Sequence, residues 1–285
     1  MKTILIQLDT DAQPSTFDRV VAVDAGTDHL FSYGGVTPDN LTPLVHGAIF
    51  TRGPQDLSQT AIFIGGSDVA AGEKLLETVQ STFFGPMRVS VMMDSNGCNT
   101  TAAAAVLAAA RHVSLSGARA LVLGGTGPVG QRAGLLLARQ GACVSIASRS
   151  ADRAEAVCER LREQCAGAEI TACESAGDSL ASELSQADIL ISAGAAGVQF
   201  LSTDQWQSAG SLKVAVDLNA VPPVGLEGIE VTEKAKQHGD VVCYGAVGVG
   251  GTKMKVHKAA VQRLFEANDR VLNTAEIYSL AEEIG

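Results

Sequence analysis

The chain has 285 residues, of which 46% are hydrophobic, a length and composition that suit two compact domains with a core each. Its 21 basic and 31 acidic residues give a formal net charge of -10, which repels polyphosphate backbones and anionic lipid, so we expect neither nucleic acid nor a membrane as a partner. The longest apolar block, residues 102–110, is half as long as a membrane span, and the 6 cysteines form no Cys-x-x-Cys pair, so we expect a cytoplasmic protein with reduced thiols and no metal.

The first 100 residues predict a small α/β domain. Three short apolar or β-branched runs, separated by helical patterns, are predicted as its strands: residues 3–8, 61–64 and 88–93. The first run meets acidic residues at once, which is typical of a strand rather than of a signal peptide. Ser15 with Asp18 three residues later resembles a capping box, and Asp68 precedes an amphipathic helix over residues 69–83.

A polar block follows the third strand and precedes an alanine-rich helix over residues 100–111 that would carry the chain into a second domain. We expect its side chains and free N–H groups to face a cleft between the domains, because a helix cap needs only one such residue and this block supplies several. Substrate contacts are therefore predicted from Asp94, Ser95, Asn96, Asn99 and Thr100. The alternative is a hydrated linker. Cys98 lies in the same block, where its thiolate could be exposed, but we do not assign it as a nucleophile.

A complete βαβ element with a glycine-rich turn opens the second domain. The turn follows a strand at 118–124, begins a helix at 129–140 that Gly141 ends, and leads to a strand at 143–148. It comprises Gly125, Thr126, Gly127, Pro128, Val129 and Gly130. We expect the first glycine to permit the tight turn, the second to let the backbone approach a pyrophosphate, and the third to allow close packing of helix and sheet. The alternative is a glycine turn with a structural role alone.

The end of the second strand of this element favours NADP. Enzymes that bind NAD usually carry an acidic residue there for the ribose hydroxyls, whereas this chain has Ser148, Arg149 and Ser150. Ser148 and Arg149, together with Arg153, can hold a 2′-phosphate through charge-assisted hydrogen bonds. We therefore predict NADP as the cofactor, with NAD as a second one. In the alternative, Arg149 is a solvated surface charge.

Four further apolar runs extend the element into a mostly parallel Rossmann-type sheet, and we place the NADP-binding domain at residues 101–250. Those runs cover residues 170–173, 189–192, 214–217 and 241–244. Two of them end in loops, at the edge where this fold class binds ligands. We predict that Ala193, Gly194, Ala195 and Asn219 in these loops flank the nicotinamide, with Asn219 holding its carboxamide. Plain turns are the alternative.

The C-terminal part, residues 251–285, is predicted to pack back on the first domain. A glycine-rich loop at 245–251 precedes it, so the chain would cross between the domains twice and frame a cleft for cofactor and substrate. Its two helical patterns cover residues 253–267 and 275–283. Lys253, Lys255 and His257 follow the loop, and in an acidic protein such a basic cluster can receive the anionic tail of a substrate. The alternative is a solvated basic face.

The fold class that these patterns predict is two-domain α/β. It combines a Rossmann-type doubly wound parallel sheet with a smaller N-terminal α/β domain, residues 1–100, which the C-terminal helices complete.

Several strings of the sequence resemble the bacterial methylene-tetrahydromethanopterin dehydrogenases. They are residues 9–18 (DTDAQPSTFD), 33–40 (YGGVTPDN), 84–90 (FGPMRVS), 94–101 (DSNGCNTT), 248–251 (GVGG) and 253–257 (KMKVH). The resemblance covers nearly the whole chain, from Leu5 to the C-terminal helix. It implies a two-domain α/β subunit, NADP or either nicotinamide cofactor, a trimeric or hexameric homo-oligomer, a tetrahydromethanopterin-type substrate and a role in the one-carbon metabolism of methylotrophs.

The resemblance also implies a mechanism. Hydride leaves the methylene carbon that bridges two pterin nitrogens and passes to C4 of the nicotinamide, and the nitrogen lone pairs stabilise the methenyl cation that forms. No proton is removed in that step, so the protein has to position the two molecules and tolerate developing positive charge. We expect Asp18, Asp94, Asn96 and Lys253 to serve orientation and electrostatics in this way.

Two other functions stay open at this point. One is a methylene-tetrahydrofolate dehydrogenase, whose architecture is more distantly similar, although the Tyr-x-x-x-Lys motif of those enzymes has no counterpart here, which argues against cyclohydrolase activity. The other is a non-catalytic NADP(H) sensor, because a Rossmann fold does not guarantee catalysis.

Overall fold

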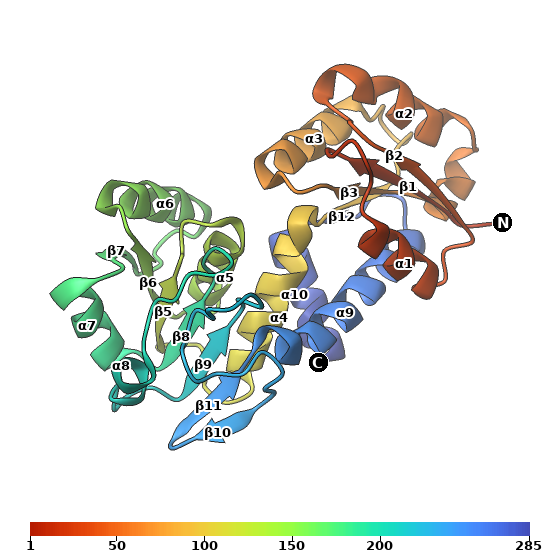
Figure 1. Cartoon of the computed structure of the whole chain (residues 1–285). Helices are drawn as coiled ribbons and strands as arrows, with labels where there is room; N and C mark the ends of the chain where they lie inside the picture. The colour runs from red at the N-terminus through yellow and green to blue at the C-terminus, as the bar shows by residue number, and fades with distance from the viewer. The chain divides into compact units, whose positions relative to one another are not determined.

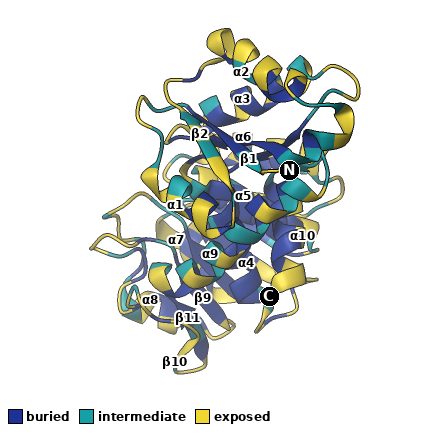
Figure 2. Ribbon diagram, turned by 90° about the vertical axis from the view of Figure 1, so that its right-hand side faces the viewer, coloured by how far each residue is buried: buried dark blue, intermediate teal, exposed yellow.

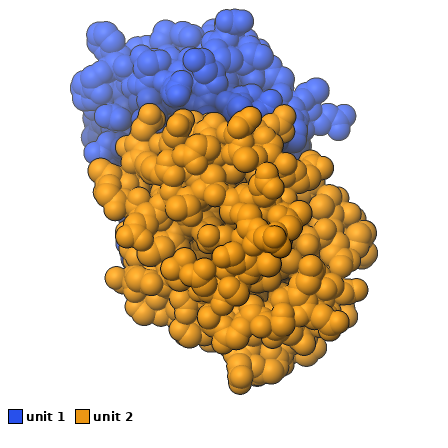
Figure 3. All heavy atoms as spheres, turned by 90° about the vertical axis from the view of Figure 1, so that its left-hand side faces the viewer, with its two compact units in different colours: residues 1–100, 254–284 blue, residues 101–253, 285 orange.

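The computed structural model describes all 285 residues, and the chain divides into two compact units (Figure 1, Figure 3). Unit 1 consists of residues 1–100 and 254–284, and unit 2 consists of residues 101–253 with Gly285. The chain passes from one unit to the other within helix α4 (Cys98–Ala110) and returns within helix α9 (Ala246–Arg263). Both crossings therefore lie in helices rather than in loops.

Unit 1 contains an entirely parallel sheet of five strands. In the order in which they lie side by side, these are β12 (Val271–Leu272), β4 (Ser90–Met93), β3 (Thr60–Gly65), β1 (Ile4–Asp9) and β2 (His29–Tyr33). The three strands expected from the sequence are confirmed. The two that were not predicted lie at the edges of the sheet, where β12 has only two residues and β2 is exposed at alternate positions, so neither shows a continuous apolar run.

Local caps fix where the helices of unit 1 begin. These helices are α1 (Thr16–Asp24), α2 (Pro38–Phe50), α3 (Val69–Thr82) and α10 (Thr274–Ile284), and short 3₁₀ turns lie at Pro54–Gln59, Ser95–Gly97 and Leu264–Glu266. The Ser15 hydroxyl accepts a hydrogen bond from Asp18 N at 3.2 Å, and the Asp68 carboxylate accepts one from Ala71 N at 3.0 Å, so both residues are N-caps as predicted. The reciprocal bond of a capping box is missing at Ser15, because Ser15 N donates to Asp9 instead. Helix α2 was not predicted, because Pro43 in its interior breaks the expected pattern.

The C-terminal segment is part of unit 1 and completes its sheet. Strand β12 pairs in parallel with β4, with Val271 opposite Val91. The Ser90 hydroxyl links the two segments twice, donating to Ala267 O at 2.8 Å and accepting from Arg270 N at 3.2 Å. Residues about 180 positions apart in the sequence are thus joined through one buried hydroxyl.

Unit 2 contains a sheet of seven strands in the order β10-β11-β9-β8-β5-β6-β7. These are β5 (Arg119–Leu123), β6 (Cys143–Ser148), β7 (Ile170–Glu174), β8 (Ile189–Ser192), β9 (Val214–Asp217), β10 (Lys236–His238) and β11 (Val241–Tyr244). All pairs are parallel except that of β10 with β11. If the six parallel strands are numbered 1 to 6 in chain order, they lie side by side in the order 3-2-1-4-5-6. This is the strand order of a Rossmann fold, so the predicted fold class is confirmed.

Helices cover the sheet of unit 2 and bury its central strands. They are α5 (Pro128–Arg139), α6 (Ala151–Gln164), α7 (Gly177–Gln186) and α8 (Thr203–Gln207). Every residue of β8 and β9 is buried (Figure 2). The fully buried Trp206 belongs to this core, and its indole N–H donates to Glu227 O at 2.9 Å. No helix of the protein combines the length and the apolar character needed to cross a membrane.

The predicted loop at residues 245–251 is wrong, because helix α9 already begins at Ala246. The loop that precedes β10 accepts its first N–H groups: Gly245 N donates to Glu233 O at 2.9 Å and Val247 N donates to Val231 O at 2.7 Å. A Cβ atom at Gly248 would overlap the carbonyl oxygen of Glu233. The glycines therefore serve a close approach of two backbones, and these bonds offset their low helix propensity.

We predict that Ser90→Ala lowers the free energy of unfolding by about 1–3 kcal/mol, because it leaves the carbonyl of Ala267 and the N–H of Arg270 without their buried partner. The only tryptophan lies in unit 2, so urea unfolding should be followed by circular dichroism rather than by fluorescence. Ser81→Ala is the matched control, since its exposed hydroxyl bonds only to Thr78 O in the same helix. Equal stability of the two variants would contradict this role of Ser90.

Candidate functional site

The glycine-rich turn lies where β5 of unit 2 ends and α5 begins. Gly124 has a φ of +64°, and a Cβ atom there would lie 2.6 Å from Gly194 Cα in the loop after β8. The tight turn expected at Gly125 lies one position earlier, because the left-handed residue is Gly124. The turn and the loop after β8 are consequently in backbone contact.

The other glycines of the turn differ in what surrounds them. A Cβ at Gly125 would lie 2.8 Å from Ile146 Cγ2, and one at Gly130 would lie 2.7 Å from Gly124 O, so both positions need glycine for packing within the protein. At Gly127 the nearest atom would be 3.3 Å away. Gly127 is therefore the residue whose missing side chain leaves room for a ligand to approach the backbone.

The first turn of α5 offers hydrogen-bond donors to an anion. Gly127 is the N-cap and Pro128 the first helical residue, and the first backbone bond of the helix runs from Gln131 N to Gly127 O at 2.9 Å. Helix geometry leaves the N–H groups of Val129 and Gly130 without a helical acceptor. Together with the partial positive charge of the helix end, these groups form the kind of site that binds phosphate.

A groove of about 210 Å³ joins this turn to the ends of β6, β7 and β8. It brings together nine of the predicted cofactor residues, namely Thr126, Gly127, Ser148, Arg149, Ser150, Arg153, Ala193, Gly194 and Ala195. Four further residues line the groove and were not predicted from the sequence, namely Gly124, Ser175, Val198 and Phe200. Of these, Ser175 follows β7 directly, a position that the carboxyl-edge rule for parallel sheets could have indicated.

One end of the groove is positively charged. Ser150 caps α6 by accepting from Arg153 N at 3.4 Å, and the Ser148 hydroxyl accepts from Ser150 N at 3.3 Å. The side chains of Arg149 and Arg153 are exposed, and neither forms an ion pair with a carboxylate of the protein. Two guanidinium groups and a helix N-terminus thus converge in a chain whose net charge is -10, which suits a phosphate group.

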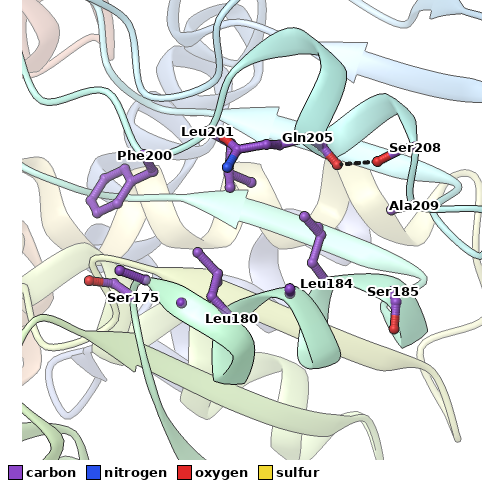
Figure 4. Close-up of a pocket in the computed structure, with 12 residues that line it drawn as sticks. Ser175, Leu180, Leu184, Ser185, Phe200, Leu201, Gln205, Ser208 and Ala209 are labelled. Atoms are coloured by element: carbon purple, nitrogen blue, oxygen red, sulfur yellow. Dashed lines mark hydrogen bonds between the residues drawn. The ribbon is translucent and has the colours of Figure 1, made fainter.

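A second hollow, of about 310 Å³, shares Ser175 and Phe200 with the groove (Figure 4). It lies between α7 and the segment that contains α8, with Leu180 and Leu184 on one side and Leu201 on the other (Figure 4). It contains no lysine or arginine. This hollow therefore lacks the positively charged contacts that suit phosphate in the groove.

Asn219 lies in the loop after β9, where its side chain serves the loop itself. Its amide nitrogen donates to Pro223 O at 3.2 Å and to Ala195 O at 3.4 Å, and its amide oxygen accepts from Val221 N at 3.0 Å. Neighbouring Asp217 is buried, and burial raises the pKa of its carboxyl. Both donor hydrogens of Asn219 are thus engaged in holding the two loops together, and its contact with the carboxamide stays a prediction.

In unit 1 the carboxyl edge of the sheet has its own reversal point. From β2 the strands run 2-1-3-4-12, so the direction of winding reverses between β1 and β3, the place where open α/β sheets bind ligands. Asp9 ends β1 and Gly65 ends β3. The Asp9 carboxylate accepts from Asp11 N and Ser15 N, each at 2.9 Å, and orders the loop between them. A Cβ at Gly65 would lie 3.4 Å from the carboxylate of Asp18, which places Asp18 at this reversal point.

Most of the polar block after β4 is engaged within unit 1. Asp94 accepts from the backbone N–H groups of Asn99 and Thr100 at 2.9 and 3.0 Å and from the Thr100 hydroxyl at 2.6 Å. The Ser95 hydroxyl donates to Gly65 O at 3.0 Å. Helix α4 begins at Cys98, so the last residues of the block belong to the helix that they were expected to precede. We therefore assign Asp94, Ser95 and Thr100 to holding α4 on the sheet.

Two other residues of the block also differ from expectation. Asn99 lies between strand and tail, donating to Met93 O at 2.6 Å and to Asn273 at 3.0 Å while accepting from the Thr274 hydroxyl at 2.7 Å. Cys98 is fully buried, so the exposed thiolate considered from the sequence is ruled out.

Asn96 is the member of the block that stands out. Its side chain is exposed, and its backbone has a φ of 52° and a ψ of 22°, a left-handed conformation that is uncommon outside glycine. A hydrogen bond of 2.7 Å from its N–H to Gly66 O holds it there. Strained residues of this kind cluster at ligand sites, which keeps Asn96 as a candidate for substrate contact.

His257 is buried among aromatic and acidic side chains of unit 1. Its ring stacks on Phe63 with centroids 5.5 Å apart and an interplanar angle of 17°, and its Nδ1 atom lies 4.0 Å from Asp94 Oδ2. The ring of Phe17 lies 6.3 Å away. Neither phenylalanine was predicted, because nothing in the sequence relates β3 and α1 to a histidine near the other end of the chain. Lys255 is exposed, and Lys253 precedes His257 by one helical turn.

Comparisons with known proteins agree with the two-unit division. The family model of the N-terminal domain of methylene-tetrahydromethanopterin dehydrogenase matches residues 16–96, and that of shikimate/quinate 5-dehydrogenase matches residues 106–238. The bifunctional protein MdtA of Methylorubrum extorquens is 46% identical over 286 residues, with 99% of both chains covered. The NAD(P)-dependent methylenetetrahydromethanopterin dehydrogenase of the same organism is 32% identical over 294 residues, again with 99% of both chains covered.

Among solved structures, shikimate dehydrogenase from Mycobacterium tuberculosis aligns with a TM-score of 0.51 and 15% identity, covering 99% of this chain and all of that one. At this identity the likeness concerns the fold alone.

We predict that Gly130→Ala weakens binding of NADP by roughly tenfold to a hundredfold, because the added methyl group must push the turn away from α5 at a cost of about 1–3 kcal/mol. Calorimetric titration of the folded variant measures this. Gly210→Ala is the control, since a Cβ atom there meets nothing within 4 Å. If both variants bind NADP as the unchanged protein does, the turn does not contact the cofactor as assigned.

Proposed function

The chain belongs to the methylene-tetrahydromethanopterin dehydrogenase family, and from this premise we propose that it oxidises methylene-tetrahydromethanopterin to methenyl-tetrahydromethanopterin with NADP. Its relative of that name is 32% identical over the full length of both proteins. The observation that carries the proposal further is the groove of unit 2, in which a phosphate-binding turn and two unpaired arginines lie together. The protein is thus an oxidoreductase, and different residues support the assignment of its cofactor and of its substrate.

The residues of the groove fit the charged parts of NADP. The N–H groups at the start of α5 suit the pyrophosphate, and Ser148, Arg149 and Arg153 suit the 2′-phosphate. An acidic residue after β6 would repel that phosphate, and Ser148 with Arg149 stands in its place. When bound, NADP supplies the acceptor for a hydride.

The reaction requires the protein to position the substrate against the cofactor, and it requires no acid–base catalyst. The bond that breaks is a C–H bond of the methylene bridge, the hydride takes both electrons, and the positive charge left behind is shared by two substrate nitrogens. A protein contributes here by orienting the substrate and by offering negative charge where positive charge develops. This accounts for the chemistry without a Ser/His/Asp or Cys/His arrangement.

We propose that the carboxyl edge of the sheet in unit 1 receives the pterin. Asp18 supplies negative charge at the reversal point between β1 and β3, and Asn96 supplies an exposed amide. Lys253 and Lys255 supply positive charge for the anionic part of the substrate, whereas the buried His257 lies beside Asp94 and acts as a positioning residue. Asp94 acts as a positioning residue, because its carboxylate already accepts three hydrogen bonds from the start of α4.

Methylene-tetrahydrofolate is the second candidate substrate. The relative at 46% identity is named a bifunctional protein, which favours testing a second pterin.

We also propose a cytoplasmic location, as suits a chain with six separate cysteine thiols. Burial raises the pKa of Cys173 to about 12, so this thiol stays protonated and unreactive.

We predict that Arg149→Ala weakens NADP binding by about one to two orders of magnitude and leaves NAD binding unchanged, since only NADP carries the phosphate that loses a charge-assisted contact. The dissociation constants of both cofactors measure this directly. Arg139→Ala, which removes another exposed arginine near the end of α5, should alter neither. A loss of the same size for both cofactors would exclude the 2′-phosphate as the partner of Arg149.

We further predict that deuterium placed on the methylene bridge appears on the reduced nicotinamide and not in water, because no proton transfer precedes the hydride. Mass spectrometry of the product nicotinamide gives the result, with tetrahydromethanopterin and tetrahydrofolate substrates run side by side. Unlabelled substrate in heavy water is the control and should give unlabelled nicotinamide. Washout of the label into solvent would rule out direct transfer, and absence of turnover with both pterins would overturn the proposed function.

A further inference from the structure

Three carbonyl groups of the glycine-rich turn in unit 2 are held by donors of the protein itself. Gly124 O accepts from Gly127 N at 2.9 Å, and Gly127 O accepts from Gln131 N at 2.9 Å. Thr126 O accepts from the side-chain amide of Gln131 at 2.7 Å. A carbonyl oxygen carries partial negative charge and repels an anion, so these bonds favour a turn that presents N–H groups to a phosphate.

The carbonyl of Thr126 is the one among these three that depends on a side chain. Thr126 lines the groove, so its oxygen lies next to the place assigned to the pyrophosphate. The peptide unit that carries this oxygen ends at Gly127, and a glycine restricts the rotation of that unit less than any other residue would. The bond from Gln131 therefore supplies a restraint that the backbone lacks, and it offsets the negative end of the carbonyl dipole.

The start of α5 places Gln131 where it can make this bond. Gln131 is the fourth residue of the helix, and the side chains of a helix lean toward its N-terminus. Its backbone N–H reaches Gly127 O and its side chain reaches Thr126 O, so one residue fixes two successive carbonyl groups. Removal of the side chain amide would release the carbonyl of Thr126 and keep the bond to Gly127.

Helix α6 determines the orientation of the Gln131 amide. Arg160 of α6 donates from Nη2 to Gln131 Oε1 at 3.3 Å, and its Nε donates to Ala156 O at 3.4 Å in its own helix. A guanidinium group has donors only, and a backbone carbonyl only accepts. The amide therefore satisfies both neighbours in a single orientation, with its oxygen toward Arg160 and its nitrogen toward Thr126. The turn is thus linked through one side chain to the helix that begins at the basic end of the groove.

We infer that Gln131 is a positioning residue for the cofactor. It does not line the groove, and it acts through the carbonyl of Thr126. The inference rests on the proposed function, because it takes the turn as the site of the pyrophosphate. NADP and NAD share the pyrophosphate, so Gln131 supports the binding of both, whereas Arg149 and Arg153 serve the 2′-phosphate of NADP alone. Affinity and cofactor choice are thus set by different residues of unit 2.

The inference is tested by Gln131→Met in the full-length protein. Methionine has a similar length and packs in the same space, but it offers no donor to Thr126 O. We expect the dissociation constants of NADP and NAD to rise about tenfold each, on the scale of one lost hydrogen bond beside a charged group. Affinity for adenosine 2′-monophosphate should stay unchanged, because this ligand carries the 2′-phosphate and no pyrophosphate. Calorimetric titration with the three ligands measures this.

Two further variants separate the bond to Thr126 from the packing of α5 against α6. Gln131→Glu can still accept from Arg160 but cannot donate to Thr126 O, so it should weaken both dinucleotides at least about tenfold. It also serves if Gln131→Met does not fold. Gln140→Met is the matched control, because it makes the same substitution at the other end of α5, and it should leave all three affinities unchanged.

Unchanged affinity for both dinucleotides in a folded Gln131 variant would overturn the inference. An equal loss for adenosine 2′-monophosphate would overturn it as well, since Gln131 would then support the groove as a whole rather than the pyrophosphate site. If the unchanged protein bound none of the three ligands, the proposed function would fail and the inference with it. That outcome is seen before any variant is made, so the two failures are distinguishable.

Discussion

The groove that we propose for the cofactor depends on one contact between two backbones. The turn after β5 and the loop after β8 approach until a side chain on Gly124 would strike Gly194, and a Cβ atom at Gly194 would overlap the ring of Phe200. This approach brings the start of α5 and the ends of β6 and β8 to the wall of one groove. Asn219 supports it from a third loop by bonding to Ala195 O. Because the two glycines have no side chains, the turn and the loop can approach closely, and this approach places the charged residues at one groove.

Each unit presents charged groups at the carboxyl edge of its sheet, but the charges of the two edges are opposite. In unit 2 the carboxyl edge presents Arg149, Arg153 and helix N-termini, which suit a cofactor rich in phosphate. In unit 1 the corresponding edge presents carboxylates, with Asp9 and Asp94 ordering backbone and Asp18 at the reversal point. A substrate that becomes a cation fits the acidic edge, and a polyanionic cofactor fits the basic one. The charge of each edge thus agrees with the molecule assigned to it.

The features that could be predicted from the sequence are those that depend on residues close together in the chain. The βαβ element, the caps at Ser15 and Asp68 and the basic end of the groove follow from residue types and spacing, and all appear in the structure. What sequence could not predict depends on distant partners. The glycines near Gly248 seemed to indicate a loop, yet bonds from another segment make them helical. In the same way, Asn219 turned out to be occupied by carbonyl groups that no spacing rule relates to it.

The discontinuity of unit 1 has a consequence for its biosynthesis. Its first strands leave the ribosome early, but the sheet lacks its last strand until Val271 and Leu272 have been made and can align with β4. Unit 2 is encoded without interruption between the two halves, so its sheet can close while the tail of unit 1 is still being translated. Joining segments about 180 residues apart costs loop-closure entropy and favours slow, late assembly. The order in which the units mature is therefore the reverse of the order in which their first residues are synthesised, and nascent chains truncated before β12 should expose the flank of β4 to chaperones.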